Sequence, residues 1–221
     1  MGETTELKAA DGHRFKTYRA EPSGKAVGAV VIAPEIFGVN PHIRSVADGF
    51  AADGFLVLAP ALFDRAQRDY EAGYEDTDIA AGRAIIGEIE MDTALRDIDA
   101  CVAAGAEAGK VGLVGYCWGG TIAWLAAART AGLSCAVSYY GGGIAGYQNE
   151  KPAIPLMLHF GEQDTHPSLE DARKIAGDNP TAQSFFYPAG HGFNCDARGS
   201  FNPDASAQAR TRTVEFFRQH L

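Results

Sequence analysis

The sequence lacks the features of membrane-spanning, exported and repetitive proteins. No stretch reaches the roughly 20 apolar residues that a membrane helix needs, so we expect no membrane partner. The first residues, MGETTELKAADG, have neither a basic start nor an apolar core, which predicts a cytoplasmic protein in a reducing environment. No internal repeat is visible, so the chain must be interpreted segment by segment.

Basic residues are also in short supply. The chain has 19 Lys and Arg against 28 Asp and Glu, and its net charge is −9. This charge repels nucleic acid phosphates and anionic membrane surfaces, so we expect no nucleic acid partner. A small anionic substrate is not excluded, because one arginine can dominate a pocket that is shielded from solvent.

Cysteine is scarce, and its spacing is not that of a zinc site. The four cysteines are Cys101, Cys117, Cys135 and Cys195. Cys101 and Cys135 lie in apolar helical and strand patterns, which is typical of buried small hydrophobic residues. A metal site of His159, His166 and His191 is disfavoured, because a histidine within a strand beside turn histidines lacks ligand geometry. We expect neither a metal nor a cofactor.

What the chain does have is the composition of a globular protein. Its 221 residues, 46% hydrophobic and 21% charged, fit a single domain over 1–221, which we expect to be monomeric. Strand and helix patterns alternate over most of the length, which predicts a mostly parallel central sheet with helices on both faces. An Asp11-Gly12 turn predicts an N-terminal hairpin. The predicted strands are 3–9, 13–20, 29–33, 55–59, 110–115, 133–139, 155–160 and 183–187. The predicted helices are 41–53, 91–108, 118–131, 168–176 and one from about 204.

One segment does not follow this alternation. Residues 61–80 contain six acids against only Arg65 and Arg68. Two interpretations stay open: a solvated connection, and a loop or lid over a pocket.

A sharp turn between a strand and a helix follows residue 110. The apolar strand pattern runs into Gly115-Tyr116-Cys117-Trp118-Gly119 and then into a helical pattern. In this context G-x-C-x-G is typical of the nucleophile elbow of α/β-hydrolases, because the glycines allow a tight turn that projects the central side chain. The helix N-terminus favours the thiolate, which is the reactive form. We therefore predict an α/β-hydrolase fold with Cys117 as nucleophile.

The acid and base that such a nucleophile needs follow in the expected order. Asp164 comes after the predicted strand 155–160, and His191 comes after the strand 183–187. The ends of parallel strands meet at one edge of the sheet, so both can converge on Cys117. Glu162 stays open as an alternative acid and His166 as an alternative base.

The segment after the strand 29–33 predicts the rest of the site. In this fold the loop there supplies a backbone N–H to the oxyanion hole, which predicts Ile36 together with Trp118. Glu35 is unexpected, because a carboxylate near a thiol opposes thiolate formation and can accept the thiol proton. The alternative is a surface glutamate or an ion pair between Glu35 and Arg44.

These motifs resemble the dienelactone hydrolase family, the carboxymethylenebutenolidases. The resemblance covers nearly the whole chain, and its most specific pieces are EIFGVN at 35–40, KVGLVGYCWGG at 110–120, GEQD at 161–164 and AGHGF at 189–193. It implies a triad of Cys117, Asp164 and His191 that cleaves a small ester or lactone through a thioacyl-enzyme. It also implies that a substrate carboxylate displaces Glu35, which then takes the proton from sulfur.

The resemblance further implies arginines that hold a substrate carboxylate. One family arginine matches Cys195, and Arg198 follows three residues later. The other matches Ile79, and Arg83 follows about one helical turn later. We take Arg83, Arg198 and Tyr140 as candidate substrate-binding residues.

Two other functions stay open at this point. The first is a redox-responsive thiol or binding protein without turnover, in which Cys117 is oxidised and Cys195 is its disulfide partner. The second is a thiol peptidase or amidase, although no extended substrate channel is evident. The complete order of nucleophile, acid and base favours the hydrolase acting on a small ester or lactone.

Overall fold

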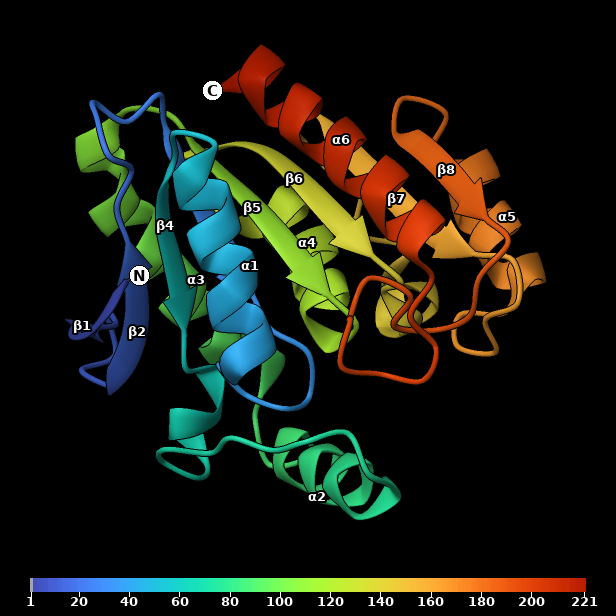
Figure 1. The fold of residues 1–221 in the computed structure, drawn as a ribbon, viewed down its shortest axis with the longest axis horizontal. Coiled ribbons are helices and arrows are strands. Elements are labelled where there is room, and N and C mark those ends of the chain that lie inside the picture. The colour runs from blue at the N-terminus through green and yellow to red at the C-terminus, as the bar shows by residue number, and fades with distance from the viewer. Residues whose placement is uncertain (1) are drawn as a thin grey trace.

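The apolar runs of the sequence form the centre of an eight-stranded sheet. The computed structural model describes residues 2–221. β3 (Ala29–Ala33) and β5 (Val111–Tyr116) lie side by side in the middle, and every residue in them is buried. A strand can be apolar throughout only when helices cover both faces of its sheet, which is the arrangement in Figure 1.

The sheet is mostly parallel, with an antiparallel N-terminal hairpin at one edge. Its strand order is β1-β2-β4-β3-β5-β6-β7-β8. β1 pairs antiparallel with β2 and β2 with β4, whereas the remaining neighbours are parallel. The other strands are β1 (Glu3–Lys8), β2 (Arg14–Ala20), β4 (Leu56–Pro60), β6 (Leu133–Tyr139), β7 (Leu156–Gly161) and β8 (Gln183–Tyr187).

Helices cover the two faces with separate apolar clusters. Phe50 of α1 and Phe217 of α6 belong to the cluster on one face, and Ile98 of α3 and Ile122 of α4 belong to the cluster on the other. The helices are α1 (Pro41–Ala52), α2 (Asp76–Ile86), α3 (Met91–Gly105), α4 (Trp118–Arg129), α5 (Leu169–Asp178) and α6 (Pro203–His220). Short 3₁₀ turns are η1 (Leu62–Arg65), η2 (Ala106–Ala108) and η3 (Gly142–Tyr147).

The predicted fold class and hairpin are confirmed, and so is the local signal that begins α1. The Asn40 side chain accepts a hydrogen bond from the N–H of Ile43, and Pro41 takes the first helical position. This is the arrangement that the sequence predicted, because an N-cap oxygen satisfies an N–H that the helix leaves unpaired.

The segment 61–80 is more ordered than a simple solvated connection. It contains η1 and the beginning of α2, and Figure 1 shows α2 apart from the two helical layers, below the sheet. Neither α2 nor η3 was predicted from the hydrophobic pattern. Both line the cavity described below, so the lid interpretation fits the structure better.

Among the residues that the structure describes, none of the helices combines the length and apolar character that crossing a membrane requires.

Candidate active site

The elbow between β5 and α4 holds Cys117 in a backbone conformation that few side chains adopt. Its φ of 55° and ψ of −115° lie outside the helical and strand regions. A Cβ atom at Gly115 would overlap with the carbonyl oxygen of Gly119, and one at Gly119 would overlap with that of Ala33. Both glycines are therefore required by the close approach of three backbone segments, and the turn leaves the sulfur partly exposed.

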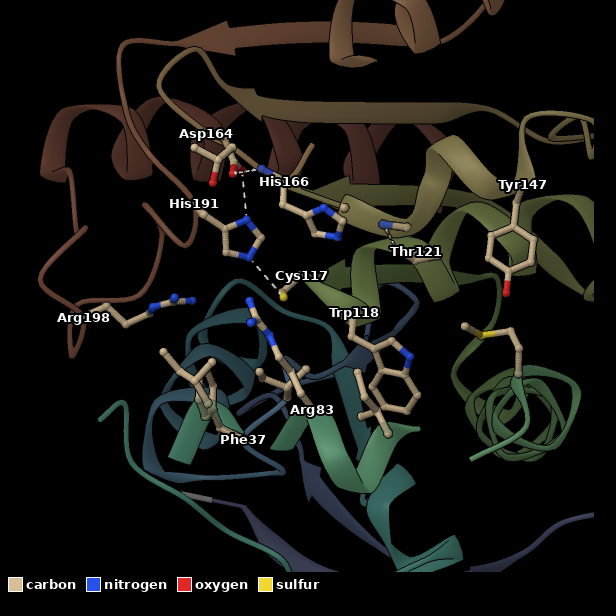
Figure 2. Close-up of a pocket in the computed structure, with 17 residues that line it drawn as sticks. Phe37, Arg83, Cys117, Trp118, Thr121, Tyr147, Asp164, His166, His191 and Arg198 are labelled. Atoms are coloured by element: carbon tan, nitrogen blue, oxygen red, sulfur yellow. Dashed lines mark hydrogen bonds and ion pairs between the residues drawn. The ribbon is translucent and has the colours of Figure 1, made fainter. Parts of the chain in front are cut away.

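The three predicted catalytic side chains meet at the carboxyl edge of the sheet. His191 Nε2 lies 3.1 Å from Cys117 Sγ, and His191 Nδ1 lies 2.9 Å from Asp164 Oδ2 (Figure 2). Asp164 is 7% exposed, and its Oδ1 accepts a hydrogen bond of 2.8 Å from the backbone N–H of His166. One histidine thus bridges a thiol and a carboxylate that is held in place by the main chain.

The alternative acid and base occupy other positions. Glu162 is exposed and absent from the cavity. The His166 side chain lines the cavity, but the imidazole that contacts the sulfur is that of His191. His166 contributes its backbone N–H, which donates a hydrogen bond to Asp164 and orients it.

His191 is strongly basic for a histidine. Burial lowers its pKa, but hydrogen bonds with Asp164 and Cys117 and the negative charges of both outweigh burial and raise the pKa to about 10. The imidazolium is therefore favoured at neutral pH. The structure therefore places a positively charged imidazole 3.1 Å from the Cys117 sulfur.

Tyr140 supports the histidine and does not line the cavity. Its side chain is fully buried, and its ring packs edge-on against His191 with centroids 5.1 Å apart. The cavity is lined by other residues, so the structure places Tyr140 against His191 and outside the cavity lining. The sequence could not reveal this, because the residue lies just beyond the last residue of β6.

Glu35 is buried beside the site and pairs with Arg198. It is 1% exposed, and its Oε1 lies 3.3 Å from Arg198 Nη1. Its other oxygen, Oε2, has no hydrogen-bond partner within residues 2–221. Arg44 forms its ion pair with Glu71 at 2.6 Å, so the expected alternative of a Glu35–Arg44 pair is wrong. Arg198 partly neutralises the negative charge of Glu35. The Cys117 sulfur has its own contact, with His191 Nε2.

The loop after β3 reaches the elbow, as the oxyanion-hole prediction requires. The N–H of Gly119 donates a hydrogen bond of 3.2 Å to the carbonyl of Pro34, which joins this loop to the start of α4. Ile36 and Trp118 both line the cavity around Cys117. The two residues that were predicted to supply backbone N–H groups therefore both lie at the cavity that contains Cys117.

A cavity of about 430 Å³ opens over the triad. The sequence interpretation missed several of its lining residues, because they come from a loop and from helices whose orientation depends on tertiary packing. These residues are Phe37, Ile86, Met91, Thr121, Gly142, Gly143 and Tyr147.

Arg83 and Arg198 both line this cavity. In Figure 2 the guanidinium of Arg83 extends from α2 toward Cys117. No carboxylate among residues 2–221 forms an ion pair with Arg83. Arg198 lies with its guanidinium carbon 5.6 Å from the centre of the Phe37 ring. The structure thus brings together two of the three predicted substrate-binding residues.

All four cysteines are free thiols, including the pair considered for a disulfide. Cys101 and Cys135 are fully buried, as predicted. Burial and the negative charge of Glu35 raise the pKa of Cys195 to about 11, so this side chain stays a thiol at neutral pH. Cys117 and Cys195 therefore do not form the disulfide that a redox pair would need.

Potential metal ligands gather in one place within residues 2–221. His42 Nδ1 lies 2.9 Å from Asp196 Oδ1, and the sulfur of Cys195 lies close to both.

The three histidines considered as metal ligands in the sequence do not come together. His159 lies in the core, where its ring nitrogens contact the hydroxyls of Tyr187 and Thr213. No group formed by His159, His166 and His191 is found among the described residues.

The fold is that of an α/β-hydrolase, and the site has a partly exposed cysteine on a strand–helix elbow with a carboxylate and an imidazole at later strand ends. Residues 15–221 match the dienelactone hydrolase family, and the chain belongs to this family. Its members are carboxylic ester hydrolases, so the protein is an ester or lactone hydrolase.

Relatives match this chain over nearly its whole length. It is 32% identical to carboxymethylenebutenolidase 1 of Cupriavidus pinatubonensis, over 97% of this chain and 96% of the relative. It is 34% identical to a candidate carboxymethylenebutenolidase of Synechocystis sp., over 92% and 91%. The crystal structure of a candidate dienelactone hydrolase from Klebsiella pneumoniae superposes with a TM-score of 0.85 at 26% identity, covering 99% of this chain and 98% of that one.

Proposed function

We propose that this hydrolase cleaves a small ester or lactone bearing a carboxylate, through a thioacyl-enzyme on Cys117. The observation that carries the proposal is the bridge of His191 between Cys117 Sγ at 3.1 Å and Asp164 Oδ2 at 2.9 Å. A nucleophile and a base within hydrogen-bond reach, with the base oriented by a third group, is the arrangement that covalent catalysis requires.

The proposed reaction begins when Cys117, having given its proton to His191, attacks the carbonyl carbon. The carbonyl oxygen becomes an oxyanion, which the backbone N–H groups of Ile36 and Trp118 stabilise. The carbon–oxygen bond then breaks, and His191 gives its proton to the leaving oxygen. Water attacks the thioester, His191 accepts a proton from that water, and the acid leaves as the thiol is restored.

The arginines of the cavity provide the basis for recognising a carboxylate. Arg83 lines the cavity without an ion-pair partner among the described residues, and Arg198 is held only by Glu35. A substrate carboxylate competes with Glu35 for Arg198, because a bidentate contact between arginine and carboxylate is stronger than the single one seen here. The released Glu35 can take the place of His191 as the acceptor of the sulfur proton, as the family resemblance implies. His191 is then already protonated and still supplies the proton for the leaving oxygen.

The thioester can be trapped directly. When the enzyme is mixed with an activated acetate ester and quenched in acid, mass spectrometry of the digest should find one acetyl group on the peptide that contains Cys117. Cys117→Ala should abolish turnover, and Cys101→Ala is the matched control that should retain it. Acetyl found on another residue, or a tenth of the activity surviving in Cys117→Ala, would remove Cys117 from the mechanism. A redox thiol without turnover would release no phenol from an aryl acetate, neither in an initial burst nor at a steady rate.

A further inference from the structure

The cavity has two chemically different ends, one on each side of Cys117. Arg198 lies on one side of the sulfur and Tyr147 on the other (Figure 2). The first end carries the guanidinium groups of Arg83 and Arg198. The second end, which we call the apolar arm, has Trp118, Thr121 and Tyr147 on the side of the sulfur away from Arg198 (Figure 2). We include in it two further lining residues that share hydrophobic clusters with Trp118, namely Ile86 and Met91. A single ligand that fills both ends must therefore be charged at one terminus and apolar at the other.

The walls of the apolar arm are held by contacts outside the cavity. The Trp118 indole packs edge-on against Phe63, with ring centroids 5.6 Å apart. On the opposite wall, the backbone carbonyl of Tyr147 accepts a hydrogen bond of 3.3 Å from the buried Trp124 indole. Both aromatic walls are thus anchored to the fold, which lowers the entropic cost of binding a rigid group between them.

The chemistry of the apolar arm excludes a charged occupant. None of its five residues is charged; the Thr121 hydroxyl accepts a hydrogen bond of 3.0 Å from the N–H of Gly143, and the remaining side-chain hydroxyl is that of Tyr147. A charged group placed there would lose its hydration without gaining a partner, whereas apolar surface gains from leaving water. The arm therefore fits a group that water solvates poorly.

The size of the cavity also favours a ligand that occupies the apolar arm as well as the arginine end. Its volume of about 430 Å³ lies within the range of roughly 300–1,000 Å³ that is usual for sites of drug-sized ligands. A short acyl group with a carboxylate would occupy only the arginine end.

We propose that the apolar arm binds a ring-sized apolar group on the alcohol side of the ester, so that the substrate is an amphipathic monoester. Its carboxylate lies at Arg83 and Arg198, its scissile carbonyl at Cys117, and its aryl or branched alkyl group between Trp118 and Tyr147. This inference rests on the proposed function and adds the substrate class to it.

The test compares monomethyl succinate with monobenzyl succinate, which share the acyl group and the carboxylate and differ only in the alcohol. Acid release is followed in a pH-stat. The value of kcat/KM should be about tenfold or more higher for the benzyl ester, the factor expected for burying part of an aromatic ring. Equal values for the two esters would overturn the assignment of the apolar arm.

Variants on the two sides of Cys117 separate the two ends of the cavity. Tyr147→Ala should reduce the ratio of benzyl to methyl kcat/KM toward one, whereas Tyr147→Phe, which keeps the ring, should preserve the ratio. Met91→Ala, from α3, is a second variant on the same arm if Tyr147→Ala does not fold. Arg83→Gln should lower kcat/KM for both esters and leave the ratio unchanged. A benzyl preference that survives both Tyr147→Ala and Met91→Ala would overturn the proposal.

These outcomes distinguish failure of the inference from failure of the proposed function. If both succinates are hydrolysed equally well while Cys117 is acylated, the thioacyl mechanism stands and the apolar arm has no role in specificity. If neither ester is hydrolysed and no ester acylates Cys117, the proposed function itself is wrong.

Discussion

At the scale of single residues, the basicity of His191 depends on Asp164. Asp164→Asn removes a negative charge and replaces an acceptor oxygen, so the pKa of His191 should fall from about 10 toward its ordinary value. The wrong tautomer also becomes favoured, and kcat should fall by at least about a hundredfold. An NMR titration of the His191 ring in wild type and variant measures the first change, and ester hydrolysis measures the second. An unchanged pKa would mean that Asp164 has no electrostatic role.

Because Glu35 and Arg198 form an ion pair, substitutions of these two residues should change the alkylation rate of Cys117 in opposite directions. Glu35→Gln removes a negative charge near sulfur and a proton acceptor, so iodoacetamide should alkylate Cys117 faster while hydrolysis of a carboxylate-bearing ester falls. Arg198→Gln leaves the carboxylate charge uncompensated, so alkylation should become slower. Labelling rates at neutral pH, followed by mass spectrometry, measure both effects. Slower alkylation in Glu35→Gln would contradict a gating role.

The sequence predicts which three side chains meet at the edge of the sheet but not how the loops around them run. Cys117, Asp164 and His191 each follow a strand of the parallel sheet, and topology alone brings such positions to one edge. Arg198 reaches Glu35 through the path of the loop after His191, for which the chain offers no periodic signal. Tyr140 was misplaced for a related reason: the end of a strand predicts proximity to the site, not the side on which the ring lies.

At the scale of elements, regular patterns predict the strands and most helices, and tertiary contact decides the rest. α1 has a cap, a proline at its start and apolar residues at helical spacing, so its bounds could be predicted closely. α2 buries only Gly82, and its N-terminal half is acidic, so it lacks the apolar stripe that marks a core helix. The position of α2 depends on the close contact of Gly82 with Ile36, and only the folded structure shows this contact.

That contact predicts that α2 sets the shape of the cavity. A Cβ atom at Gly82 would overlap with the carbonyl oxygen of Ile36, so Gly82→Ala must push α2 away from the loop that is proposed to hold the oxyanion. We expect kcat/KM to fall by about tenfold or more, because α2 carries Ile79, Arg83 and Ile86 of the cavity lining.

The matched control for Gly82→Ala is Gly177→Ala in α5, where the added Cβ meets no atom within 4 Å. It should leave kcat/KM unchanged and raise stability by about 0.5–1 kcal/mol, because alanine is the better helix former. Full activity in Gly82→Ala, with circular dichroism unchanged, would show that the position of α2 does not matter for catalysis.

At the scale of the whole molecule, two histidines make stability depend on pH in opposite directions. The pKa of His191 is raised to about 10, so the folded protein holds this proton more tightly than the unfolded chain does. Its contribution is fully present below pH 6.5 and is lost as the pH rises toward 10. Burial, with the charge of Arg212, lowers the pKa of His159 to about 3, so here the unfolded chain binds the proton more tightly.

The contribution of His159 is therefore fully present above pH 6.5 and is lost as the pH falls toward 3. Between pH 6.5 and pH 4.5 this histidine alone should cost about 2–3 kcal/mol of the free energy of unfolding. His159→Gln does not titrate and can still bond to the hydroxyls of Tyr187 and Thr213. Urea unfolding at both pH values should show that the variant, although less stable at pH 7, loses less stability on acidification than the wild type. An equal loss in both proteins would mean that carboxylates whose pKa is lowered by a neighbouring arginine, such as Glu150 beside Arg129, govern the acid limb.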